Sequence, residues 1–140
     1  MVLNVLVRCF AIGVVAGLRS MTAPAATLAA ADSHWAGPAR FAATGELAVD
    51  KLPIAPSRLM PGPLAARVLS GTICGRTLAR RAHGSAPLGM LTGAVGALAG
   101  SYGGYHVRHF MTATWKLPDF PLALVEDSLA VGLARLATTR

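Results

Sequence analysis

The fold of this chain is decided by a glycine-rich apolar stretch, GAVGALAGSYGG at residues 93–104. Its glycines recur every three or four residues, so they share one side of a helix. In lipid, this spacing lets two helix backbones approach closely and hold together through dispersion contacts. Packing within one chain is the interpretation that we favour, and a seam between copies is the alternative. The predicted helix-packing residues are Gly93, Gly96, Gly100 and Gly104.

The composition of the chain indicates a membrane protein. The 140 residues are 54% hydrophobic and 14% charged, and the mean hydropathy is +0.53. A soluble domain has about 25% charged residues, because it exposes a large surface to water. The charged residues here are too few to cover a surface exposed to water, so we predict that lipid surrounds the protein. We expect one domain of the all-α integral membrane class, with four to five transmembrane or half-spanning helices.

Apolar segments and breaks place the expected helices. Residues 2–31 predict a retained first helix rather than a signal peptide, because Arg19 interrupts the apolar core. Residues 39–49 are too few to cross about 30 Å of hydrocarbon upright, and whether they span or re-enter stays open. A central helix is expected at about 62–81. Two further helices are expected at 87–111 and 120–137.

A shift of 80 residues aligns the chain with itself. The tryptophan, proline and glutamate matches carry the most weight, since these residues are rare here. We predict two repeats, at 2–58 and 86–138, joined by the central helix. If residues 39–49 cross the bilayer, the repeats are inverted, as in many secondary transporters; otherwise they are parallel. The matches are Gly13 with Gly93, Val15 with Val95, Leu18 with Leu98, Trp35 with Trp115, Pro38 with Pro118, Ala43 with Ala123 and Glu46 with Glu126.

In a soluble protein, a net charge of +7 would suggest binding to nucleic acid. The basic residues are scattered at the expected bends and form no block with interleaved aromatic residues, so no nucleic-acid partner is expected. Cations at helix ends suit anionic headgroups instead. Trp35 and Trp115 flank apolar runs, where indole favours the headgroup level.

Acidic residues within apolar segments are the strongest candidate site. Glu126 and Asp127 lie near the middle of the last segment, where an unpaired carboxylate costs at least about 2.5 kcal/mol. Arg19 or Arg67 is the expected partner. A structural ion-pair cluster and an ion, proton or polar-substrate site both remain open. The predicted intramembrane polar site is Arg19, Glu46, Asp50, Lys51, Arg67, Glu126 and Asp127.

Other reactive residues predict little chemistry. Tyr102, Tyr105 and His106 are candidate pore or substrate contacts, and the pair of His106 and His109 is a weak metal signal. The two cysteines are isolated, which suits neither a zinc site nor a disulfide framework. No nucleophile has a base at a catalytic spacing. We therefore expect no enzyme, no metal and no cofactor.

Several motifs resemble one known family. They are AGLRSMTAP at 16–24, ELAVDKLP at 46–53, LAARVLSG at 64–71, GSYGGY at 100–105, LPDF at 117–120 and LVED at 124–127. Together they resemble the bacterial membrane-protein family catalogued as domain of unknown function 4126. The resemblance implies a multi-pass protein of the bacterial inner membrane, and it carries no activity or catalytic residue. It also implies that Arg19, Asp50, Lys51, Arg67 and the pair at 126–127 belong together.

Two functions follow from these features. The first is a small transporter- or channel-like bundle, expected to be a homo-oligomer in the lipid bilayer, with an unidentified ion or small solute as substrate. The alternative is a structural or assembly module that packs against a partner through its glycine-rich faces.

Overall fold

The computed structural model describes residues 2–19, 22–30, 34, 36–49, 60–116 and 118–139. Over these residues the chain forms six helices and no strand, which confirms the expected all-α class. The number of helices exceeds the four to five expected, because the first apolar segment is broken. The helices are α1 (Val2–Leu18), α2 (Thr22–Ala30), α3 (Ala36–Val49), α4 (Pro61–Arg81), α5 (Ala86–Trp115) and α6 (Asp119–Thr138).

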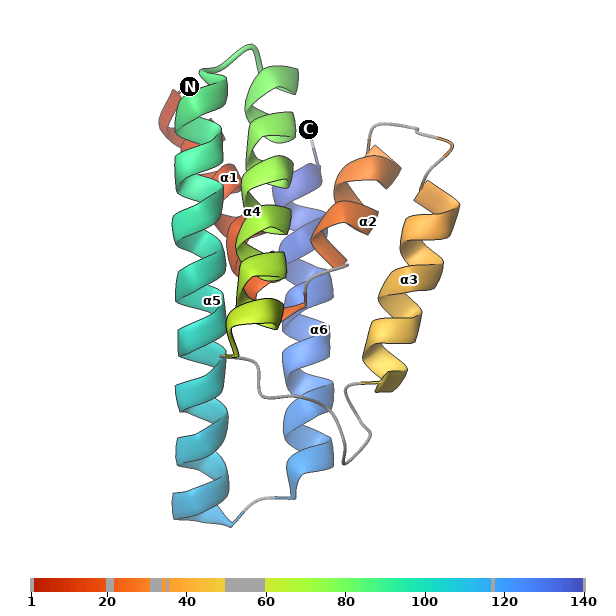
Figure 1. The fold of residues 1–140 in the computed structure, drawn as a ribbon, viewed down its shortest axis with the longest axis vertical. Helices are drawn as coiled ribbons and strands as arrows, with labels where there is room; N and C mark the ends of the chain where they lie inside the picture. The colour runs from red at the N-terminus through yellow and green to blue at the C-terminus, as the bar shows by residue number, and fades with distance from the viewer. Residues whose placement is uncertain are drawn as a thin grey trace.

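The prediction of one helix over residues 2–31 is wrong. Helix α1 ends at Leu18, and α2 starts again at Thr22 and runs back beside α6 (Figure 1). Proline explains part of the break, because a proline in a helix interior loses a hydrogen bond and clashes with the carbonyl four residues earlier. Pro24 instead lies in the first turn of α2, where no intrahelical partner is lost.

Helices α4 and α5 form a hairpin that follows the expected segments closely. Pro61 and Pro63 lie in the first turn of α4, where proline is tolerated. Arg80 and Arg81 lie in its last turn, where cations favour the helix dipole. Helix α5 has 30 residues, or about 45 Å of length. It ends at Trp115, and the next residue, Lys116, has a φ of 49° that turns the chain toward α6.

Three helices form the inner bundle. Helix α5 runs parallel to α1 and antiparallel to α4 (Figure 1), and these three make the closest mutual contacts. Helix α6 packs on α1 and makes few contacts with α5. Helix α2 lies against α3, α4 and α6, so that α3 is added to the bundle through α2.

Glycines bring the three inner backbones into direct contact. A methyl group at Gly93 would collide with the carbonyl oxygen of Gly71, and one at Gly71 would lie 2.7 Å from the carbonyl oxygen of Gly93. The predicted packing residues at 93, 96 and 100 are therefore covered by α1 and α4 within the chain, whereas Gly104 lines a cavity. We call this contact the glycine seam. Its members are Gly13, Gly17, Gly71, Gly75, Gly89, Gly93, Gly96 and Gly100.

Small residues fill the bundle and large apolar residues surround it. The buried core is mostly alanine, and its largest fully buried side chain is Arg19. In contrast, Leu69 and Ile73 of α4 are each 62% exposed, and Leu136 of α6 is 72% exposed. The described residues thus place their bulky aliphatic side chains mainly on the outside.

The two halves related by the shift of 80 residues differ in arrangement. Helices α1 and α5 run in the same direction, whereas α3 and α6 run in opposite directions (Figure 1). The shift places the continuous α5 opposite the broken pair α1 and α2. Gly13 and Gly93, which the shift equates, contact each other in the seam. The duplication stays a prediction from sequence.

Helix α3 has 14 residues, or about 21 Å of length, so it is as short as expected. Whether it spans or re-enters a membrane stays open. In the described part of the chain, no helix has both the length and the apolar character needed to cross a membrane.

Candidate polar site at the end of α1

The break after α1 leaves a helix end inside the bundle. The last carbonyls of a helix have no intrahelical donor, and a buried unsatisfied acceptor costs about 1–3 kcal/mol. Here the carbonyl oxygen of Gly17 accepts a hydrogen bond from Arg67 Nη1 at 2.9 Å and another from Ser101 Oγ at 3.2 Å. Helices α4 and α5 therefore supply the donors that the break requires.

A buried ion pair lies directly beside this helix end. Arg19 is 1% exposed, and its Nη2 bonds to Oδ1 of Asp127, whose side chain is 14% exposed. Of the two arginines expected to meet the acids of α6, the structure pairs Arg19 with Asp127 and places Arg67 on the Gly17 carbonyl. Loss of one partner from such a pair typically costs about 3–5 kcal/mol.

The second acid of α6 has a partner that the sequence analysis missed. Glu126 Oε2 lies 3.8 Å from Nη1 of Arg108, with side chains 12% and 24% exposed. Arg108 follows Gly104 and Gly100 at intervals of four residues, so it lies on the same side of α5 as these glycines. That spacing is the signal that could have identified it.

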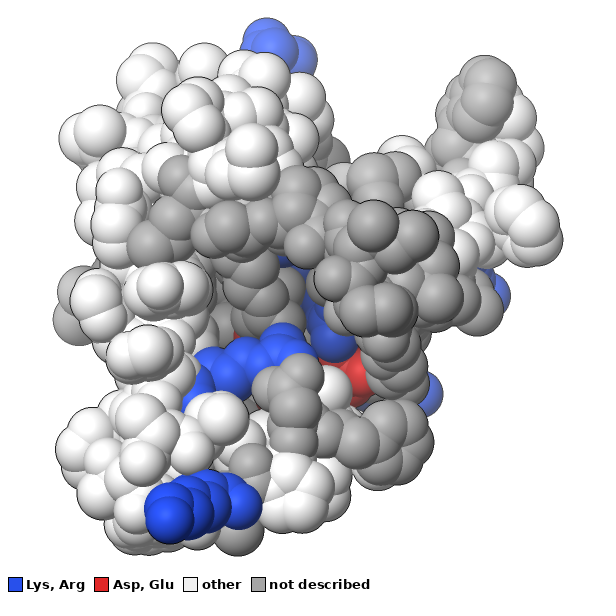
Figure 2. Space-filling view, turned by 60° about the horizontal axis from the view of Figure 1, so that its bottom comes forward, with Lys and Arg blue, Asp and Glu red and all other residues white. Residues whose placement is uncertain are grey.

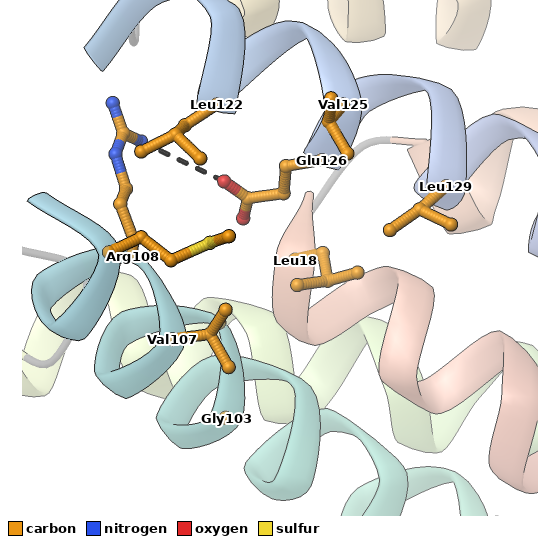
Figure 3. Close-up of a pocket in the computed structure, with 10 residues that line it drawn as sticks. Leu18, Gly103, Val107, Arg108, Leu122, Val125, Glu126 and Leu129 are labelled. Atoms are coloured by element: carbon orange, nitrogen blue, oxygen red, sulfur yellow. Dashed lines mark ion pairs between the residues drawn. The ribbon is translucent and has the colours of Figure 1, made fainter. Parts of the chain in front are cut away.

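A cavity of about 240 Å³ lies between α5 and α6, next to the end of α1. The pair of Arg108 and Glu126 borders it, and aliphatic side chains of α5 and α6 line the rest (Figure 3). A hollow is also visible on the lower face of the bundle, with basic and acidic side chains on its floor (Figure 2). The lining residues are Leu18, Gly103, Gly104, Val107, Arg108, Met111, Leu122, Val125, Glu126 and Leu129.

Part of the predicted polar site lies outside the described residues. Asp50 and Lys51 fall in the undescribed range 50–59, and Glu46 belongs to α3 but its side chain is not described. Trp35 is also undescribed, whereas Trp115 ends α5 and is 62% exposed. The grouping of Glu46, Asp50 and Lys51 with Arg19, Arg67 and the acids of α6 therefore stays a prediction.

The predicted pore or substrate contacts lie exposed on α5. Tyr102 and Tyr105 are 45% and 37% exposed on α5, and His106 is also exposed. The ring of Tyr105 meets His106 edge-on at 5.5 Å and stacks on His109 at 6.1 Å. None of these rings lines the cavity. Within the described ranges, no three His, Cys, Asp or Glu residues are grouped to hold a metal ion.

The opposite end of the bundle is rich in arginine. Arg8 Nε donates a hydrogen bond to the carbonyl oxygen of Ala137 at 2.8 Å, and Arg8 and Arg81 border a cavity of about 330 Å³. Arg40 and Arg135 border a larger cavity of about 700 Å³ between α2, α3 and α6. Of these arginines, Arg81 and Arg135 lie in the last turns of α4 and α6, where the helix dipole favours a cation.

Comparisons with known proteins identify no relative of this chain. No family model, no curated protein and no solved structure matches it significantly. The resemblance to the family of unknown function 4126 stays a prediction, and function has to be argued from the geometry of the site.

Proposed function

We propose that this chain is a multi-pass protein of the bacterial inner membrane, with a transporter- or channel-like polar site at the broken end of α1. The observation that carries the proposal is the distribution of side chains, with alanine, glycine and a buried ion pair inside and exposed aliphatic residues outside. In water, the hydrophobic effect drives the largest apolar side chains inward. In lipid that drive is absent, and small residues occupy helix interfaces.

The ends of the bundle support a membrane location. Arg80 and Arg81 close α4, Arg135 lies in the last turn of α6, and Lys116 follows Trp115 at the other end. Basic and tryptophan residues at helix ends suit the headgroup region. The membrane proposal therefore rests on the placement of side chains and charges, and not on the hydropathy of individual helices.

The break in α1 supports a transport role. Transporters commonly bind substrates and ions at interrupted helices, where helix ends and unwound backbone face a cavity. Here the break brings the Gly17 carbonyl, Arg67 and the pair of Arg19 and Asp127 together. Their chain neighbours Leu18 and Glu126 line the α5–α6 cavity. Ionisable residues buried in an apolar bundle are costly and mark functional sites by default.

The packing favours this role over an assembly module. A partner that docked on the glycine seam would have to displace α1 or α4, because these helices already cover Gly93, Gly96 and Gly100. The outer aliphatic faces remain available to lipid or to further copies of the chain. We include a homo-oligomer in the proposal, because one small bundle encloses little space for a pathway.

Reconstitution into liposomes tests both parts of the proposal. The protein is expected to stay with the vesicles after an alkaline carbonate wash and to pass at least one of protons, K⁺ or chloride above the level of empty vesicles. Asp127→Asn is expected to abolish that flux, whereas Ser128→Ala, an exposed neighbour, is expected to leave it unchanged.

A charge-swapped variant separates a functional pair from a structural one. Arg19→Asp combined with Asp127→Arg keeps the ion pair but exchanges its ends. If this variant folds and retains full flux, the pair is structural and the site is elsewhere. Release of the wild-type protein by carbonate would refute the membrane location, and the absence of flux for all three ions would refute transport of these ions.

A further inference from the structure

The two ends of the bundle differ in how their basic residues are placed. One end is formed by the start of α1, the turn between α4 and α5 and the end of α6, and it is the upper end in Figure 1. Five arginines gather at or near this end, and all five are exposed. We call it the arginine end, and its arginines are Arg40, Arg76, Arg80, Arg81 and Arg135.

Helix positions and a shared cavity bring these five arginines to the same end. Arg80 and Arg81 lie in the last turn of α4, and Arg135 lies in the last turn of α6. Arg76 lies four residues before Arg80, and therefore on the same side of α4. Arg40 of α3 borders the same cavity as Arg135. The exposed arginines thus come from three helices that meet at one end of the bundle.

Away from the arginine end, the arginines are mostly covered by the bundle. Arg19 and Arg67 are 1% and 5% exposed, and the side chain of Arg108 is 24% exposed. Each of the three has a partner in or beside the polar site. Lys116, which follows Trp115, is the exposed basic residue that the structure describes at the other end. The exposed positive charge of the described residues is therefore concentrated at the arginine end.

Basic residues outside the described ranges do not reverse this difference. They are Lys51, Arg58 and Arg140. If all three belonged to the end of Trp115, four basic residues there would face five exposed arginines at the arginine end. The excess at the arginine end therefore does not depend on where these three residues lie.

We infer that the arginine end is the cytoplasmic end of the bundle, and that its arginines contact the anionic lipid headgroups of the cytoplasmic leaflet. Lysine and arginine near helix ends set the orientation of membrane proteins and favour the cytoplasmic side, whereas acidic residues contribute little. Anionic headgroups attract basic residues close to the membrane surface. Arginines held inside the bundle by their own partners do not reach that surface.

The inference fixes the direction of every inner helix. The start of α1, the turn between α4 and α5 and the end of α6 face the cytoplasm, and Trp115 with Lys116 faces the other side. The inference rests on the proposed membrane location, and it does not require transport.

Cysteine labelling at the two ends of α5 tests the orientation. Ser85 directly precedes α5 at the arginine end, and Thr114 lies in its last turn; both are exposed. The natural Cys9 and Cys74 are 0% and 2% exposed, so the wild-type protein is the unlabelled control. With a membrane-impermeant maleimide, Ser85→Cys is expected to react at least about tenfold faster in inside-out vesicles than in spheroplasts, and Thr114→Cys is expected to show the opposite preference.

Moving positive charge from one end to the other tests the cause of the orientation. A charge-moved variant of the Ser85→Cys protein is expected to lose at least about fivefold of its preference for inside-out vesicles, because the basic residues no longer favour one end. Lys116→Gln is the matched control, and it is expected to leave the preference unchanged, because it removes a cation from the other end only. The charge-moved variant changes exposed positions and combines Arg76→Gln, Arg80→Gln, Arg81→Gln, Thr112→Lys and Thr114→Lys.

Three results would overturn the inference. They are the reverse labelling preference at Ser85→Cys and Thr114→Cys, equal labelling of each in both preparations, which would mean insertion in both orientations, and an unchanged preference in a charge-moved variant whose circular dichroism matches the wild type. Release of the protein by the carbonate wash would refute the membrane location, and the inference with it. A protein that is fixed in the expected orientation but passes no ion would refute the transport proposal alone.

Discussion

Glycines have opposite surroundings in the glycine seam and in the outer helices α3 and α6. In the seam, a methyl group at Gly93 or Gly13 would collide with a backbone carbonyl of a neighbouring helix. On α3 and α6, a methyl group at Gly45 or Gly132 would meet nothing within 4 Å. The inner half, α1, α4 and α5, is therefore held together by backbone contacts. The outer half, α2, α3 and α6, is loosely packed around a cavity of about 700 Å³.

This difference shows how a small bundle holds a polar site in place. The seam fixes α1, α4 and α5 at close range, and these helices carry Arg67, Ser101 and the Gly17 carbonyl. Helix α6 brings Asp127 and Glu126 to them from the looser side. A rigid half thus presents one part of the site, and the more adaptable half completes it.

The largest expected effect comes from Gly93→Leu in the seam. The added side chain has no room beside Gly71 and Gly75, so the inner helices must separate, and we expect a loss of roughly 4 kcal/mol or more. Thermal unfolding followed by circular dichroism measures it, with Gly132→Leu as the matched control. Equal stability of the two variants would show that the seam is not tightly closed.

The second expected effect concerns the ion pair of Arg19 and Asp127, which connects the inner half to α6. Asp127→Ala removes the carboxylate that pairs with the buried Arg19, and it is expected to cost about 3–5 kcal/mol of stability. Ser128→Ala, one residue away and exposed, is expected to change stability by less than about 0.5 kcal/mol. The same unfolding measurement compares them, and a cost no greater than that of the control would contradict the pairing.

A third, smaller effect is expected at the end of α1. Arg67→Met removes one donor from the Gly17 carbonyl and leaves Ser101 as the other, so a loss of about 1–3 kcal/mol is expected. A double-mutant cycle with Ser101→Ala measures how far the two donors act together. Strictly additive losses would mean that the two hydrogen bonds contribute independently to stability.

The smallest effect has the opposite sign and lies in the loose half. Gly132→Ala on α6 meets no neighbouring atom, and alanine is favoured over glycine in a helix by about 1 kcal/mol. We expect a small rise in the unfolding temperature. A decrease would show that the outer face of α6 is closely covered, and it would narrow the contrast between the halves.

The helices could be predicted from sequence where local signals agree. Prolines begin α4, arginines end it, and the bend near Trp115 separates α5 from α6, so these three helices match the expected segments closely. The break in the first segment was missed because its apolar character continues past Arg19. Local pattern alone therefore favoured one helix of 2–31.

The sequence predicted most residues of the candidate site but left open whether Arg19 or Arg67 pairs with the acids of α6. Arg19, Arg67, Glu126 and Asp127 were identified because charges are rare in these apolar segments. Arg108 was missed, because its neighbours on α5 include exposed polar residues that make a charge unremarkable there. The cavity between α5 and α6 has no sequence signal of its own, since it depends on where α1 ends.

By itself, the sequence determined the all-α class, the small-residue faces of the helices and the set of charged residues that need partners. Spacing along the chain is sufficient for this, because it decides which residues share a helix face. Only the tertiary structure decided that α1 breaks and that Arg19 meets Asp127, 108 residues away. A buried charge is stabilised by an oppositely charged group close to it in space, and the two groups come close only when the helices pack.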